Sequence, residues 1–135
     1  MPLGVSSLQW DLRMAWGSFT QWSFNMFQPG GIVPYPPAEH TFAYVVKTNV
    51  TDADPVILLT SDGGDASPIP SGGGELAVQS SSLLTSVILT INPAATLPLG
   101  APYQGYHALW MDYDVAGSER NLFWGQFYLD PSIQP

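Results

Sequence analysis

Glycine and proline divide this chain into short apolar runs. Each occurs 13 times in 135 residues, and most of them fall between the runs, where they mark turns. No stretch keeps the i, i+3, i+4, i+7 apolar stripe of an amphipathic helix together with helix caps. The pattern therefore predicts an all-β fold, with helix confined to a short turn near Ala94–Leu97.

Within the runs, apolar and polar residues alternate with the period of two that is typical of a half-buried strand. The predicted strands are Val5–Met14, Ser18–Phe27, Thr41–Thr48, Pro55–Thr60, Gly74–Gln79, Thr85–Asn92, Tyr103–Asp114 and Asn121–Asp130. Gln28–Pro37 and Ser61–Gly74 are predicted loops. This spacing predicts a single domain, residues 1–135, folded as an antiparallel β-sandwich, immunoglobulin-like or jelly-roll-like, of about seven or eight strands.

The charge balance excludes some classes of partner. There are 3 Lys+Arg against 11 Asp+Glu, a formal net charge of −8, and charged residues make up 10% of the chain. Ordinary soluble domains carry about a quarter. The negative sign argues against nucleic acid and anionic membrane as partners. Scarce charge together with 13% aromatic residues predicts a surface that contacts other protein.

The chain shows no signal for secretion or membrane insertion. Met1–Phe19 has no basic start, and no stretch reaches the roughly 20 apolar residues that a membrane helix requires. There is also no cysteine, so disulfides and thiolate metal sites are not available. We expect a protein that is made in the cytoplasm and folds without cross-links.

The potential metal ligands are few and scattered. The two histidines, His40 and His107, lie far apart, and His107 is predicted to be a neutral, packed side chain. Four carboxylates lie in predicted loops: Asp52, Asp54, Asp62 and Asp65. They lack the ligand spacing of a twelve-residue calcium loop, and aspartate is also typical of turns. The sequence therefore predicts no metal site and no cofactor.

A catalytic grouping is equally hard to assemble. Asp112 and Asp114 are predicted to share one strand face, where two carboxylates are poorly placed to flank a glycosidic bond. No serine lies in a G-x-S-x-G motif. The chain is therefore predicted not to be an enzyme.

The last third of the chain reads as a long aromatic hairpin around a turn at Val115–Glu119. If Asp114 faces Arg120, Trp110 lies opposite Trp124 and Tyr106 opposite Tyr128. One face then holds His107, Leu109, Met111, Phe123, Phe127 and Leu129, a set suited to the core. The other face holds Tyr106, Trp110, Trp124 and Tyr128 and is predicted to be a protein interface.

Three predicted strands carry apolar residues on both faces: Ser18–Phe27, Tyr103–Asp114 and Asn121–Leu129. A two-layer sandwich on its own should present one wet face per sheet. Apolar residues on both faces therefore favour a cover, and a neighbouring subunit is the simplest one.

Short motifs along most of the chain resemble a known family. They are GSFT at 17–20, FAYVVK at 42–47, VILLT at 56–60, VILTI at 87–91, PAATLPLG at 93–100, LFWGQF at 122–127 and the closing Asp130-Pro131. Together they resemble the small β-sandwich domains of tailed-phage virion proteins and are similar to the N-terminal domain of baseplate upper proteins. Relative to that family, Ala101–Gln104 looks inserted.

The resemblance implies a bacteriophage structural protein of the tail, baseplate or neck, or a capsid decoration protein. Its partners would be other virion proteins and further copies of itself, and it would work in the virion after synthesis in the host cytoplasm. The alternative is a carbohydrate-binding β-sandwich that uses exposed Trp and Tyr residues, because such a module shares the acidity and the aromatic surface.

Overall fold

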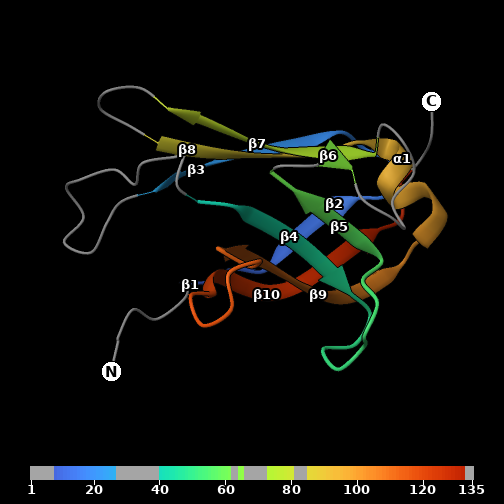
Figure 1. Ribbon diagram of the computed structural model, residues 1–135. Coiled ribbons are helices and arrows are strands. Elements are labelled where there is room, and N and C mark those ends of the chain that lie inside the picture. The colour runs from blue at the N-terminus through green and yellow to red at the C-terminus, as the bar shows by residue number, and fades with distance from the viewer. Residues whose placement is uncertain (1–7, 27–39, 62–63, 66–72, 81–84, 133–135) are drawn as a thin grey trace.

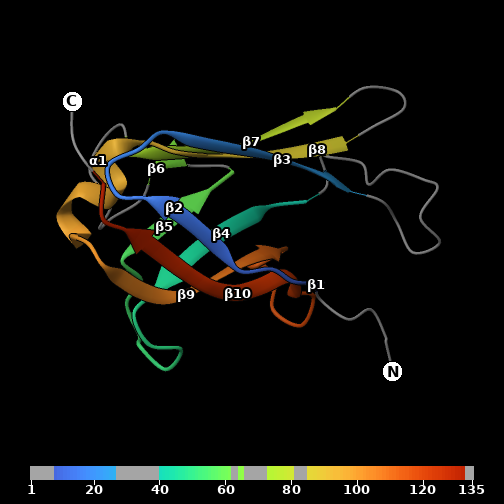
Figure 2. The same ribbon diagram turned by 180° about the vertical axis from the view of Figure 1, so that it is seen from behind.

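The computed structural model describes residues 8–26, 40–61, 64–65, 73–80 and 85–132. Two β-sheets pack face to face, and one short helical segment lies at one end of the two layers (Figures 1 and 2). The prediction of an all-β sandwich is confirmed at this level. The predicted loop Gln28–Pro37 lies outside the described residues. No helix within these ranges is long and apolar enough to cross a membrane.

The larger sheet has seven strands in the order β1-β10-β9-β4-β5-β6, with β2 also pairing with β10. They are β1 (Leu8–Gln9), β2 (Leu12–Ala15), β4 (Phe42–Lys47), β5 (Ile57–Thr60), β6 (Gly64–Asp65), β9 (Tyr103–Met111) and β10 (Arg120–Asp130). β1 and β2 run parallel to β10, a departure from the predicted antiparallel sandwich. After β2 the chain turns at Gly17 (φ 77°) and enters the other sheet as β3, so β2 and β10 are not joined by a hairpin, which would require them to run antiparallel.

The smaller sheet has three antiparallel strands in the order β3-β8-β7, namely β3 (Thr20–Met26), β8 (Thr85–Ile91) and β7 (Gly74–Ser80). On β3, Trp22 and Phe24 pack against the core, whereas Gln21, Ser23 and Asn25 are exposed. Within β3 the outer face is therefore polar. The second apolar face predicted for Ser18–Phe27 rested on Phe19, which precedes β3 and is exposed, and on Phe27, which lies outside the described residues.

Two details of the strand pattern differ from the sequence-based expectation. The predicted strand Val5–Met14 is interrupted at Trp10–Asp11, which separates β1 from β2. The predicted loop Ser61–Gly74 contains the two-residue strand β6, which pairs with the end of β5. Ten strand segments result among the described residues, where the sequence predicts about seven or eight strands.

A short helical connection joins the two sheets. It consists of α1 (Pro93–Thr96) and the 3₁₀ turn η2 (Leu97–Leu99), which confirms the predicted turn near Ala94–Leu97. Proline in the first helical turn costs no intrahelical hydrogen bond. The buried Thr96 ties the connection to the turn before β3, because its Oγ1 accepts the Gly17 N–H at 3.1 Å.

The core lies between the sheets. Its buried aromatic and aliphatic residues are Leu12, Met14, Phe42, Tyr44, Val46, Ile57, Leu59, Leu76, Val87, Leu89, Ile91, Leu109, Met111, Phe123, Phe127 and Leu129. The members that come from β9 and β10 belong to the predicted core set, which is confirmed, His107 included. These strands therefore bury one face in the usual way, and their other face is available for function.

Candidate interface on the outer face of the large sheet

The outer face of the large sheet carries a groove whose floor is a small residue. The strand register places Ala108 of β9 directly between Val45 of β4 and Trp124 of β10. Along β9, Ala108 is flanked on the same face by Tyr106 and Trp110. Because a methyl side chain stands in the middle of four larger ones, the surface is hollowed at Ala108.

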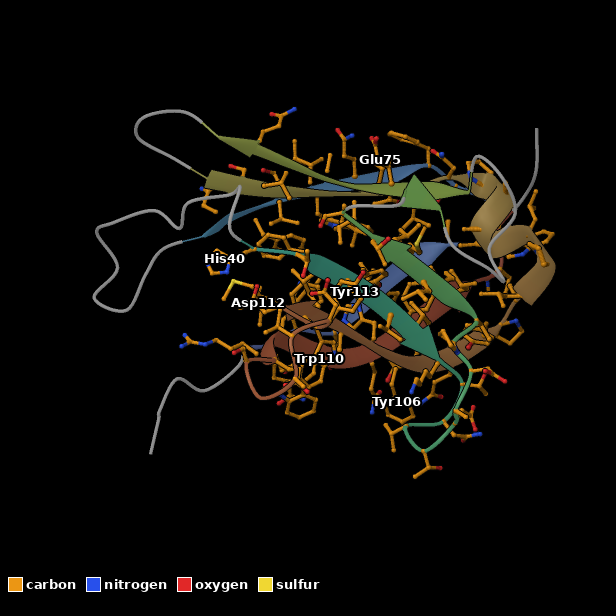
Figure 3. All side chains as sticks on the ribbon, in the orientation of Figure 1. His40, Glu75, Tyr106, Trp110, Asp112 and Tyr113 are labelled. Carbon is orange, nitrogen blue, oxygen red and sulfur yellow. The ribbon has the colours of Figure 1, made fainter. Side chains whose placement is uncertain are left out.

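The hollow has a volume of about 380 Å³, within the range of binding sites for small groups or inserted side chains. It is lined by Val45, Lys47, Val50, Tyr106, His107, Ala108, Trp110, Trp124 and Gly125, and we call it the aromatic groove. Figure 3 shows Tyr106 and Trp110 on the side of the large sheet that points away from the small sheet. The groove therefore opens outward and is separate from the core.

Several lining residues present unusual amounts of apolar surface. Trp124 is 47% exposed, Tyr106 is 37% exposed, and Val50 on the β4–β5 turn is 66% exposed. Exposed large aromatic residues clustered at a hollow are typical of interaction surfaces, whereas scattered single ones are not. Tyrosine and tryptophan are also the residues that most often dominate binding energy at protein interfaces.

Of the four residues predicted to form the interface, the structure groups Tyr106, Trp110 and Trp124 around the groove. Tyr128 shares their face but lies further along β10, outside the groove lining. There the Arg13 guanidinium lies 4.4 Å from the centroid of the Tyr128 ring and also pairs with the Asp130 carboxylate. Tyr128 therefore packs against Arg13 of its own chain and takes no part in the groove lining.

The predicted pairing of the hairpin is wrong in register, although its faces are right. Trp124 lies opposite Ala108, and Trp110 lies opposite Asn121. Beyond the bulge, the shift from the predicted register is two residues, and a shift of two keeps every side chain on its face. A β-bulge between Asn121 and Phe123 adds a further offset near the loop. Asn121 Nδ2 donates to the carbonyl oxygens of Phe123 and Leu109, at 3.0 and 3.4 Å, and so holds the bulge.

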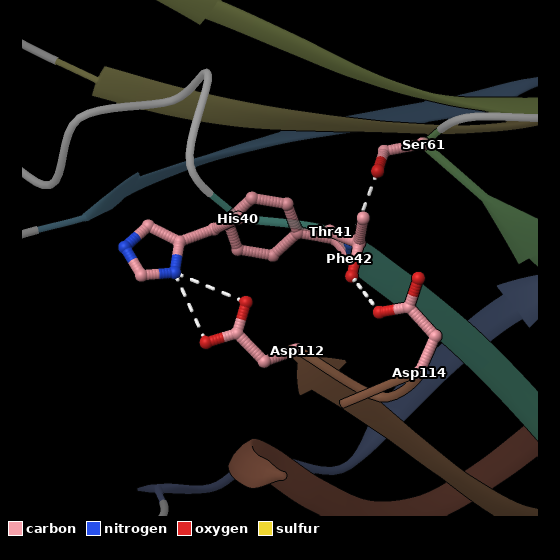
Figure 4. A network of polar contacts seen from close by, with 6 residues as sticks. All are labelled: His40, Thr41, Phe42, Ser61, Asp112 and Asp114. Atoms are coloured by element: carbon pink, nitrogen blue, oxygen red, sulfur yellow. Dashed lines mark hydrogen bonds and ion pairs between the residues drawn. The ribbon is translucent and has the colours of Figure 1, made fainter. Parts of the chain in front are cut away.

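The register differs because the two carboxylates after β9 have other partners. β9 ends at Met111, and Asp112 turns the chain with a left-handed φ of 57°, so Asp112 and Asp114 do not share a strand face as predicted. His40 Nδ1 lies 3.0 and 3.1 Å from the two carboxylate oxygens of Asp112 (Figure 4). Thr41 Oγ1 donates to Asp114 Oδ1. The carboxylates thus fasten the β9–β10 loop to the start of β4, and Asp114 does not face Arg120.

A second, polar hollow of about 280 Å³ lies at this loop. It is lined by His40, Met111, Asp112, Gly117, Ser118, Glu119 and Arg120. The His40–Asp112 pair was not apparent from the sequence, where the two residues are 72 positions apart. Within the described ranges, no cluster of three or more His, Cys, Asp or Glu residues could hold a metal ion. The pair is best described as a latch between the loop and β4.

His107 lies on the buried side of β9, behind the aromatic groove, and is 3% exposed. Its Nδ1 is 2.9 Å from the hydroxyl of the fully buried Tyr44, and its Nε2 is 2.6 Å from the Trp10 carbonyl oxygen. A neutral ring that donates from Nε2 to Trp10 and accepts at Nδ1 from Tyr44 satisfies all three groups. Burial lowers the pKa of His107, opposed by the Trp10 carbonyl and the Asp11 charge. Burial likewise raises the pKa of the Tyr44 phenol.

The same region fixes the N-terminal edge of the sheet. A Cβ on Gly125 would stand 2.2 Å from the Trp10 carbonyl oxygen, so only glycine lets the Trp10–Asp11 segment lie this close to β10. Asp11 Oδ1 accepts the Gln126 N–H at 2.9 Å, and the Trp10 N–H donates to the Trp124 carbonyl oxygen at 2.8 Å. The backbone of β10 is therefore hydrogen-bonded to the Trp10–Asp11 segment at Trp124 and again at Gln126.

The charge in the groove lining is of one sign, positive. Lys47, the only lysine of the sequence, is the one charged residue among the described residues that line the groove. Glu75 lies on the far side of the molecule, on the outer face of the small sheet (Figure 3). The groove is thus a weakly basic, apolar surface on a protein of net charge −8.

Sequence reasoning missed the groove residues that come from the β4 region, Val45, Lys47 and Val50. Their alternation with Phe42, Tyr44 and Val46 does show which β4 residues face outward. What no local pattern shows is that β4 pairs with β9, some 60 residues away, and so forms the second wall.

Compared with known proteins, the chain matches no protein-family model and has no significant match among curated proteins.

Proposed function

We propose that this chain is a structural assembly protein of a bacteriophage virion that docks other protein chains through the aromatic groove. The observation that carries the docking function is the outward-facing cluster of Tyr106, Trp110 and Trp124 around Ala108. These residues belong to strands whose other face already packs into a core, so they are not needed to close the domain.

The chemistry of the groove suits a protein partner. Its walls are rings and aliphatic groups, and a partner side chain that enters it would be desolvated on several sides, as in the energetically dominant centres of interfaces. A chain with 10% charged residues also has few groups whose desolvation would oppose association.

The virion role rests on the resemblance of the turn and strand motifs to tailed-phage β-sandwich domains, supported by the lack of cysteine and by the composition. Assembly proteins act through repeated surfaces and need no catalytic cleft. A place in the tail, baseplate or neck and a place as a capsid decoration protein are both compatible with this surface.

At the finer level of fold, we propose an immunoglobulin-like sandwich in preference to a jelly roll. In a variable-type immunoglobulin domain, strands G, F, C and C′ form one sheet and strands B, E and D belong to the other. The orders β10-β9-β4-β5 and β3-β8-β7 correspond to these two sets in chain order. The aromatic groove then lies on the outer side of the sheet that corresponds to G, F and C.

Carbohydrate binding is the second candidate, favoured by two partly exposed aromatic rings, Tyr106 and Trp124, beside a hollow of suitable size. Sugars, however, need several hydrogen-bonding groups around the ring platform. The described part of the lining supplies the Lys47 ammonium, the Tyr106 hydroxyl and two indole N–H groups, and it includes no carboxylate or amide side chain.

The test is to look for the chain in purified virions by mass spectrometry and to compare incorporation of wild type and Ala108→Phe. Ala108→Phe fills the groove from its floor without touching the core, so folding should persist while incorporation falls at least tenfold. Absence of the wild-type chain from particles would refute the virion role. Undiminished incorporation of a folded Ala108→Phe variant would refute docking through the groove, and specific signal on a glycan array would then favour carbohydrate binding.

A further inference from the structure

The β4–β5 turn beside the groove has the features of a ligand for it. The turn, residues 48–56, carries Val50, which has the largest exposed fraction of the described large hydrophobic side chains. Two carboxylates, Asp52 and Asp54, follow it in the same turn. An exposed valine followed by two carboxylates is complementary to an apolar groove whose described lining contains one charged residue, Lys47.

The turn is also held in one shape. The Asp52 N–H donates to the Asn49 carbonyl oxygen at 3.0 Å, and the Asn49 N–H donates to Asp52 Oδ2 at 2.9 Å. These two bonds close the tip in a small ring, so little conformational freedom would be lost when the tip inserts into a partner. Because the Asp52 carboxylate already serves the turn, Asp54 is the carboxylate available to meet a cation.

We infer that the groove of one copy takes the Val50 turn of a second copy, and that Lys47 of each copy pairs with Asp54 of the other. Groove and turn adjoin on one molecule, since Val50 and Lys47 both line the groove. A two-fold axis beside them therefore makes both contacts at once, as isologous interfaces require. This pairing rests on the proposed function, because it needs the groove to be a protein-docking surface.

Electrostatics favours this face over the others for self-association. Two copies of net charge −8 repel each other, and the described groove lining, which holds Lys47 and no carboxylate, does not add to that repulsion. Among the described carboxylates, Glu75 lies on the small sheet, and Asp112 and Glu119 line the other hollow, so none of these three lines the groove. Salt should therefore not abolish the dimer, since screening weakens the net repulsion as well as the paired charges.

Reciprocal charge exchange tests the pairing directly by sedimentation velocity. Lys47→Glu alone and Asp54→Lys alone each place like charges in both contacts of a homodimer, so each variant should associate at least roughly tenfold more weakly. In an equimolar mixture of these two variants, one contact is exchanged and the other is native, so a heterodimer should form with near wild-type affinity. Val50→Ser should weaken every one of these species.

The outcomes separate the two proposals. A wild-type chain that stays monomeric at high protein concentration, or single variants whose mixture does not associate, would overturn the pairing with a second copy. If Ala108→Phe still blocked incorporation into virions in that case, the groove would remain a docking surface for a different protein. Dimerisation of the wild type that survives both single charge changes unaltered would also overturn the proposed contact, because it would place the interface elsewhere.

Discussion

The two faces of the β9–β10 hairpin are made from alternate residues of the same strands, yet one face is buried within the domain and the other is exposed. On the inner face, Phe123, Phe127 and Leu129 are buried against the second sheet, and the one polar residue, His107, has both ring nitrogens bonded. On the outer face, Trp124 is half exposed beside the hollow over Ala108. Alternation alone thus creates two apolar faces, and what distinguishes them is whether the chain itself supplies the cover.

The largest expected effect is on the inner face. Phe127 is completely buried and its ring meets those of Tyr103 and His107, with centroids 6.3 and 6.1 Å apart. Phe127→Ala should lower the free energy of unfolding by about 3–5 kcal/mol, because it leaves a cavity between the sheets. Denaturant unfolding measures this change. A loss below about 1 kcal/mol would mean that the inner face is not the core face.

Next in size is the contact between β10 and the N-terminal edge. Gly125→Ala would place a methyl group 2.2 Å from the Trp10 carbonyl oxygen, and backbone must shift to admit it. We expect the free energy of unfolding to fall by about 1–3 kcal/mol. Relative to wild type, hydrogen exchange should accelerate more in β1 and β2 than in β8. Unchanged stability and exchange would show that the Trp10–Asp11 segment does not lie against Gly125.

Features of this hairpin that depend on neighbouring residues in the sequence could be predicted, and features that depend on distant residues could not. Its two faces could be predicted from the strands themselves. Residues alternate with a period of two, Phe and Leu fall on one face, and Trp, Tyr and Gln fall on the other. Its register could not, because Asp112 and Asp114 bond to His40 and Thr41, which are more than 70 residues away. A pairing with nearby Arg120 was the only local alternative.

Only part of the groove could be predicted, because only some of its residues belong to a local sequence pattern. Tyr106, Trp110 and Trp124 are a sequence-visible set, and the structure does place them together. The hollow itself depends on Ala108 lying between Val45 and Trp124, which requires the pairing of β4 with β9. The parallel edge strands β1 and β2 were missed because nothing in their alternation shows which strand they join.

A smaller effect concerns the polar contact within the inner face. Tyr44→Phe keeps the ring and removes the hydroxyl that bonds His107 Nδ1, leaving a buried acceptor without its donor. The expected loss is about 1–2 kcal/mol, measured by denaturant unfolding. Trp22→Phe, at a half-buried ring of the small sheet, is a control for general changes of aromatic packing. If Tyr44→Phe were neutral, water or another group would have to satisfy Nδ1.

The protonation of His107 gives a pH dependence of known sign. Because burial lowers its pKa in the folded state, the unfolded chain binds the proton more readily. The stabilisation is therefore complete above about pH 6.5, the unfolded value, and is lost as the pH falls below it.

Unfolding measured at steps between pH 7.5 and pH 5 should show this decline in wild type and a shallower one in His107→Gln. His40→Gln serves as the matched control and should retain the His107 component of the slope. An identical slope in wild type and His107→Gln would contradict the buried neutral ring.

The smallest expected change in stability is on the outer face, and it is the one that separates the two faces most sharply. Trp124 is 47% exposed and lies on a strand whose backbone is held by Trp10 and Asp11, so Trp124→Ala should cost no more than about 1 kcal/mol in unfolding free energy. The same substitution removes the largest ring from the groove wall and should weaken dimerisation at least tenfold, since truncated tryptophans at interface centres often cost 2 kcal/mol or more. Thr90→Ala, a truncation on the small sheet that removes the acceptor of the Gln21 Nε2 hydrogen bond away from the groove, should leave association unchanged. If Trp124→Ala instead destabilised the fold strongly and left association intact, the proposal would be contradicted. Trp124 would then contribute to folding and not to the interface.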